Sequence, residues 1–102
     1  MATHLPHIIV GLFNGLLREA IREQKSIEFT LPQLFETFSQ LNKQIAELNQ
    51  TETGYKEFRK VVFNIPINEE MKKRGGEIII LDNKGKVDES VYCLTVKDFI
   101  QP

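Results

Sequence analysis

The chain has 102 residues, of which 41% are hydrophobic and 26% charged, and this composition is ordinary for one folded domain over 1–102. Its single cysteine, Cys93, excludes a disulfide within the chain and fits a reducing cytoplasmic location. The net charge of −1 argues against a protein that binds nucleic acid over its whole surface, although residues 55–86 hold eight Lys and Arg against five Asp and Glu.

The first predicted helix covers residues 5–24, where apolar residues recur at helical spacing. Its mainly apolar part, 5–17, is shorter than the ~20 residues that cross a bilayer, so we expect no membrane segment. Gly11 and Gly15 weaken the helix, which suggests close approach of another element along that face. The apolar surplus of this helix also predicts a homodimer interface.

A short strand is expected next, since Ile27 and Phe29 point to one face of an extended segment that can join the edge of a later hairpin. Thr30 and Gln33 then have the spacing of a capping box, and Pro32 fits the first turn of a helix.

The second predicted helix runs from about residue 31 to residue 48. Its apolar residues are three and four apart, which is a heptad pattern over two and a half repeats. That pattern fits either a dimerising coiled coil or a bundle helix packed on the first helix. We favour the bundle helix because a free coiled coil normally sustains three or four heptads. The heptad residues are Leu31, Leu34, Phe38, Leu41, Ile45 and Leu48.

The third predicted helix covers about 55–64, with Thr51 or Thr53 as its cap and Pro66 as its stop. A fourth, short helix is predicted at 69–74. Asn68 can cap it, acidic residues begin it, basic residues end it, and Gly75-Gly76 follows.

A β-hairpin is predicted over about 77–96. An apolar run at 78–81 leads into a turn at 82–85 that suits type I geometry, and a β-prone run returns through Val87 and 91–96. A lone hairpin is marginal in water, so this one must pack on the helices. The predicted fold class is therefore α+β, mainly helical with a C-terminal β-hairpin.

No convincing catalytic set is visible. His4, His7 and the distant Cys93 do not make up a four-ligand metal site. Gly75-Gly76 lacks the Lys and Ser/Thr of a phosphate-binding loop. We therefore expect no metal, no cofactor and no enzymatic activity.

Cationic residues are the remaining candidates. Lys56, Arg59 and Lys60 fall on one face of the third predicted helix, which could lie in or across a DNA groove and contact phosphates or guanine edges. Basic residues at the end of the fourth helix and at the hairpin tip would add contacts. These further candidates are Lys72, Lys73, Arg74, Lys84 and Lys86.

This order of helix, short strand, helix, helix and hairpin resembles winged helix-turn-helix DNA-binding domains. The resemblance implies that the third helix reads the major groove and that the hairpin touches an adjacent groove. Three features depart from that family: a second helix of about 18 residues, an extra helix after Pro66, and a hairpin tip whose acidic residues outnumber its lysines.

Two hypotheses follow. The first is a small, dimeric DNA-binding regulator that uses the helix at 55–64 and the hairpin. The second is a protein-protein interaction module without a nucleic-acid role, which the net charge, the acidic tip and the apolar first helix favour. We lean to the first by analogy of fold.

Overall fold

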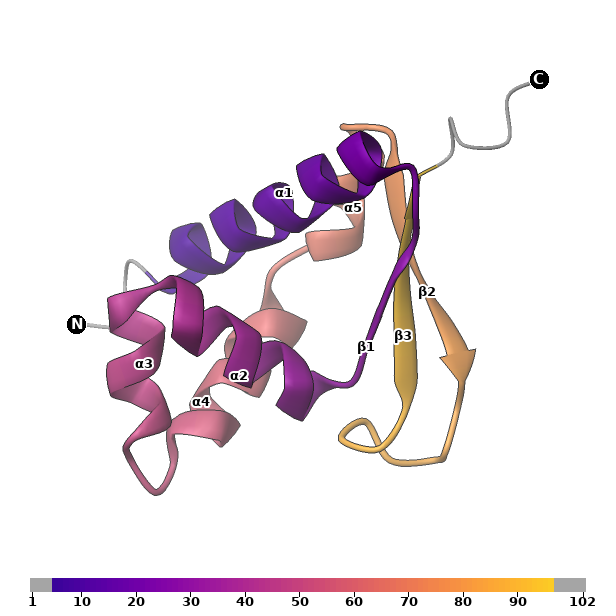
Figure 1. Cartoon of the computed structure of the whole chain (residues 1–102). Helices are drawn as coiled ribbons and strands as arrows, with labels where there is room; N and C mark the ends of the chain where they lie inside the picture. Colours follow the sequence, from indigo (N-terminus) through magenta and orange to yellow (C-terminus); the bar gives the residue numbers. More distant parts are fainter. Residues whose placement is uncertain (1–4, 97–102) are drawn as a thin grey trace.

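The computed structural model describes residues 5–96 and confirms the predicted α+β, mainly helical class (Figure 1). Two of the strands form the C-terminal hairpin. In chain order the elements are α1 (Leu5–Glu23), β1 (Ile27–Phe29), α2 (Leu31–Leu41), α3 (Lys43–Asn49), α4 (Gly54–Asn64), α5 (Ile67–Lys72), β2 (Gly76–Asp82) and β3 (Val91–Val96).

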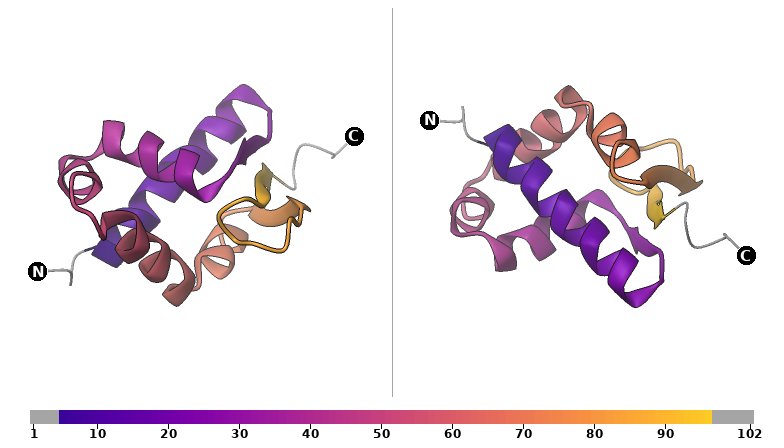
Figure 2. Two further views of the ribbon diagram at one scale, coloured as in Figure 1. Left: turned by 90° about the horizontal axis from the view of Figure 1, so that it is seen from below. Right: turned by 90° about the horizontal axis from the view of Figure 1, so that it is seen from above.

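The strands form one antiparallel sheet in the order β1-β3-β2. Leu94 of β3 lies opposite Ile27 of β1 and Ile78 of β2, so the short strand predicted after the first helix does join the hairpin. The helices lie to one side of the sheet (Figures 1 and 2). Within that layer α1 packs against β3 and α5 against β2.

Aromatic side chains join the helices in the core. The ring of Phe38 in α2 lies 5.4 Å from that of Phe13 in α1 and 6.1 Å from that of Phe58 in α4, both in edge-on geometry. Such pairs add about 0.5–1.5 kcal/mol each beyond their burial. All three rings are fully or almost fully buried, and Leu94 brings the sheet into the same core.

The prediction of a single helix over 31–48 is wrong, because the helix is interrupted at Asn42. This residue is extended (φ −143°, ψ 128°), and its side chain accepts hydrogen bonds from the amides of Gln44 and Ile45, which begins α3. The break leaves Leu41 61% exposed but buries Ile45. Four of the six heptad residues lie in this chain's own core, as a bundle helix requires: Leu31, Leu34, Phe38 and Ile45.

Helix starts differ from the predictions at two further places. The side chain of Thr53 makes no capping bond to α4, and that of Thr51 donates to the carbonyl of Leu48 instead. α5 begins at Ile67 after Pro66, so Asn68 is inside the helix and is not its cap. The Asn68 Oδ1 atom accepts a hydrogen bond from the Ile78 amide of β2 at 2.9 Å, a contact between elements that local sequence does not reveal.

The hairpin turn is longer than predicted. β2 ends at Asp82 and β3 begins at Val91, so Val87 lies in an eight-residue loop, 83–90, and not in the returning strand. Gly85 takes the left-handed conformation (φ 82°) that the turn requires. A β-bulge between Ile80 and Asp82 twists the edge strand just before the loop.

The prediction that another element packs closely against Gly11 and Gly15 is also wrong. Apart from the adjacent residues and the nearby backbone of α1 itself, no atom lies within 4 Å of the position that a Cβ would take at either glycine. The buried face of α1 instead carries Ile9, Phe13 and Leu17.

Candidate nucleic-acid interface

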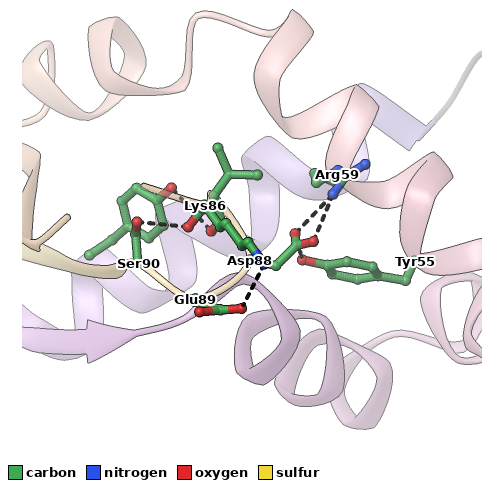
Figure 3. Close-up of polar contacts among 8 residues, drawn as sticks. Tyr55, Arg59, Lys86, Asp88, Glu89 and Ser90 are labelled. Atoms are coloured by element: carbon green, nitrogen blue, oxygen red, sulfur yellow. Dashed lines mark hydrogen bonds and ion pairs between the residues drawn. The ribbon is translucent and has the colours of Figure 1, made fainter. Parts of the chain in front are cut away.

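The hairpin loop is attached to α4 through Asp88 (Figure 3). The Nη1 atom of Arg59 donates to both carboxylate oxygens of Asp88, at 2.8 and 3.0 Å, and the Tyr55 hydroxyl donates to the same carboxylate. The Arg59 guanidinium also lies 5.8 Å from the centre of the Tyr55 ring. One turn of α4 thus supplies two donors, since residues four apart share a helix face.

These contacts shift the ionisation of their members. The hydrogen bond from Tyr55, followed by the hydrogen bond and charge of Arg59, lowers the pKa of the Asp88 carboxyl below its usual value. Burial and the bond to Asp88 raise the pKa of the Tyr55 phenol far above its usual value. The carboxylate is therefore charged and the phenol neutral throughout the physiological pH range.

The loop also has internal contacts that give it a defined path. The hydroxyl of the buried Ser90 donates to the Lys86 carbonyl at 2.8 Å and accepts from the Lys84 amide at 3.2 Å. The Tyr92 hydroxyl donates to the Val87 carbonyl at 3.3 Å. The sequence shows the acidic residues of the tip but not the structural roles of Asp88, which depends on contacts with the distant α4, and of Ser90, which depends on the path of the loop.

Five of the eight predicted cationic residues have carboxylate partners. Arg59 pairs with Asp88 as described above. Lys73 and Arg74 share Glu70, at 3.5 and 3.1 Å, which lowers the pKa of the Glu70 carboxyl chiefly through the Arg74 hydrogen bond. The two tip lysines also pair locally: Lys84 lies 2.9 Å from Asp82, and Lys86 lies 3.9 Å from Glu89.

The other three candidates, Lys56, Lys60 and Lys72, are exposed and form no ion pair within residues 5–96. Lys56 and Lys60 lie one turn apart on the outward face of α4, where Phe63 is 54% exposed and Asn64 is exposed as well. The opposite face buries Phe58 and Val62. The structure thus separates Arg59, which holds the loop, from the two outward lysines.

Comparison with family models, curated proteins and solved structures finds no match for the chain. The combination of helices with a small antiparallel sheet is compatible with a winged-helix-like arrangement. The extra helix after Pro66 is present as α5, and the long second helix is replaced by α2 and α3.

Most of the apolar side chains of α1 are buried in the core of this chain. Among the large hydrophobic side chains that are exposed in residues 5–96, Ile21 is the one that belongs to α1. Consecutive apolar side chains are exposed instead on β2, at Ile79, Ile80 and Leu81. Across 5–96, no helix is long and apolar enough to cross a membrane, and no metal-binding cluster of His, Cys, Asp and Glu occurs. His4 lies outside the described residues, and His7 is exposed.

Proposed function

We propose that this chain is a small DNA-binding regulator that contacts duplex DNA through α4 and the hairpin loop of a winged-helix-like domain. The observation that carries the proposal is the outward face of α4. Lysine contacts phosphates or guanine, asparagine pairs with adenine, and an apolar ring can meet a thymine methyl group. The exposed side chains of this face include Lys56, Lys60, Phe63 and Asn64.

The attachment of the loop to α4 supports the same proposal. Because Asp88 is bound by Arg59 and Tyr55, the loop is held against the helix. We assign Arg59 a positioning role and leave DNA contact to the lysines. Lys84 and Lys86 remain candidates, because their ion pairs are exposed and exposed pairs contribute little to stability. A phosphate can replace their carboxylate partners at little cost.

The same reasoning applies to the end of α5. Lys72 has no ion pair in the described part of the chain, and Lys73 and Arg74 share one partly exposed carboxylate, that of Glu70. They can add backbone contacts. A homodimer, with Ile21 of α1 at its interface, would double these contacts. The proposal places the protein in the cytoplasm and assigns it no cofactor and no catalytic activity.

Fluorescence anisotropy of a labelled random-sequence duplex, titrated with protein at two salt concentrations, tests the proposal. We expect binding that weakens with salt, and a salt slope smaller by about 2 in a Lys56→Ala/Lys60→Ala variant, because each phosphate contact contributes about 0.9. The matched control is Lys25→Ala/Lys43→Ala, which removes two exposed lysines outside α4. No binding at low salt by folded protein, or equal loss in both variants, contradicts the proposal.

The alternative function, a protein-protein interaction module, is favoured by a different observation. Three consecutive apolar side chains are exposed on the edge strand β2, in a chain of net charge −1. Patches of this kind commonly mark protein contacts. Failure to bind DNA, together with a stable complex or homodimer that is lost in an Ile80→Lys variant, would favour this alternative.

A further inference from the structure

An apolar cleft of about 230 Å³ opens between the α4–α5 connection and the sheet. Phe13 and Phe29 at its base are almost fully buried, while Phe63 at its rim is 54% exposed. Four of its lining residues are aromatic, and the others are mainly aliphatic. The residues that matter for the argument are Phe13, Phe29, Phe63, Ile67, Ile78 and Tyr92.

Polar groups are few in this lining. The Oδ1 atom of Asn68 is already bonded to the Ile78 amide, and the Tyr92 hydroxyl donates to the Val87 carbonyl. Glu69 is the one charged side chain of the lining; it is exposed and forms no ion pair within 5–96. The cleft therefore has an almost wholly apolar lining and one acidic lining residue, which forms no ion pair among the described residues.

We propose that this cleft binds a small aromatic amine, with the ring among the apolar side chains and the ammonium group beside Glu69. The volume fits such a molecule, since an apolar cavity of about 150 Å³ takes up benzene. The aromatic walls favour an aromatic ring, and the carboxylate favours a cation over a neutral or anionic group on that ring. The cleft accommodates one ring and not the row of side chains that a docked helix presents.

This site goes beyond the proposed DNA contact and does not depend on it. The two sites share Phe63, which lines the cleft and is exposed on α4, but the lysines of α4 are not among the residues that line the cleft. Ligand binding can therefore be measured on the protein alone, without DNA, and the two proposals can fail separately.

Amide chemical shifts in ¹⁵N-labelled protein, titrated separately with benzylamine, benzyl alcohol and benzoate, test the inference. We expect saturable shifts for benzylamine at the amides of Glu69, Ile78 and Tyr92, weaker binding of benzyl alcohol, and none of benzoate. Glu69→Gln should weaken benzylamine about two- to fivefold, the effect of one exposed ion pair, and leave benzyl alcohol unchanged. Glu19→Gln, on the exposed surface of α1, is the matched control and should change neither.

Three results would overturn the inference. The first is the absence of saturable shifts at the cleft amides with benzylamine. The second is equal affinity for benzylamine and benzyl alcohol in the unaltered protein, which removes the role of the carboxylate. The third is a benzylamine affinity that Glu69→Gln and Glu19→Gln change to the same extent. Because Glu69 is exposed, its replacement should leave the fold intact, so each result is interpretable.

Discussion

Arg59 of α4 and Asp88 of the hairpin loop form an ion pair at 2.8 Å, although 29 residues separate them in the chain. Tyr55 donates to the same carboxylate from one turn earlier in the helix. This contact attaches the loop, which carries Lys84 and Lys86, to α4. Any surface that uses both α4 and the loop therefore depends on Asp88.

The strength of this contact can be measured with a double-mutant cycle of Arg59→Gln and Asp88→Asn. The side chains are 33% and 40% exposed, so solvent screening limits the coupling free energy to about 0.5–1 kcal/mol in urea unfolding. The matched cycle is Lys84→Gln with Asp82→Asn, where exposures of 52% and 51% predict coupling close to zero. Equal coupling in the two cycles would contradict a positioning role for Arg59.

The same contact predicts a dependence of stability on pH. The Tyr55 hydrogen bond and Arg59 lower the pKa of Asp88 in the folded chain below the value of about 3.9 for an unfolded aspartate. Such a carboxyl stabilises the fold above the unfolded pKa, and the contribution is lost as the pH falls through the folded pKa. We expect Asp88→Asn to lose less unfolding free energy than the unaltered chain below about pH 4. Parallel profiles in acid urea titrations would refute this prediction.

Two glycines should respond to alanine in opposite directions. A Cβ at Gly54 would lie 1.7 Å from the Leu48 carbonyl oxygen, so Gly54→Ala must displace the backbone. We expect it to lower the free energy of unfolding by about 2 kcal/mol or more. At Gly11, inside α1, a Cβ meets nothing within 4 Å, and alanine should stabilise the helix by about 0.5–1 kcal/mol. Thermal and urea unfolding of both variants measure the difference. A loss at Gly11 would indicate a partner on that face of α1.

Local chemistry was sufficient to predict much of this fold. The Thr30–Gln33 capping box, with both of its bonds present, begins α2 where the spacing predicts. Gly75 has a positive φ at the turn into β2. The heptad spacing continues through Asn42 and so does not reveal the break, whereas the Asn42 side chain competes with the helix by bonding to nearby backbone amides.

Contacts between distant residues were the part that sequence could not supply. Arg59 was correctly placed on the same helix as Lys56 and Lys60, but its pairing with Asp88 depends on where the hairpin packs. The apolar surplus of α1 predicts an interface, but most of these side chains lie in the core of this chain. In each case the residue type was apparent, while its partner was set by tertiary structure.

The cap at Asn42 should be measurable in isolation. Asn42→Ala removes the acceptor for the amides of Gln44 and Ile45, and loss of such a cap costs about 1 kcal/mol of unfolding free energy. Gln40→Ala, an exposed change two residues earlier, should remain within about 0.5 kcal/mol of the unaltered chain. Equal effects in urea unfolding would show that the break does not depend on this cap.

Asn68 should protect the edge of the sheet. Its Oδ1 atom accepts the hydrogen bond from the Ile78 amide, which faces away from β3. This amide therefore cannot donate to a strand of a second molecule. Asn68→Ala should therefore lower the free energy of unfolding by about 1–2 kcal/mol, because the partly buried Ile78 amide loses its partner. The substitution also leaves the edge of β2 open beside the exposed Ile79 and Ile80. We expect faster hydrogen exchange at Ile78 and concentration-dependent self-association in light scattering.

Asn68→Asp is the matched control for this prediction, because the aspartate keeps an acceptor oxygen at the same position. It should preserve slow exchange at the Ile78 amide and remain monodisperse under conditions in which the alanine variant associates. If both variants associate equally, the side-chain acceptor is not what guards β2. If neither variant associates, the bulge between Ile80 and Asp82, which twists the other end of the strand, is sufficient to prevent sheet extension.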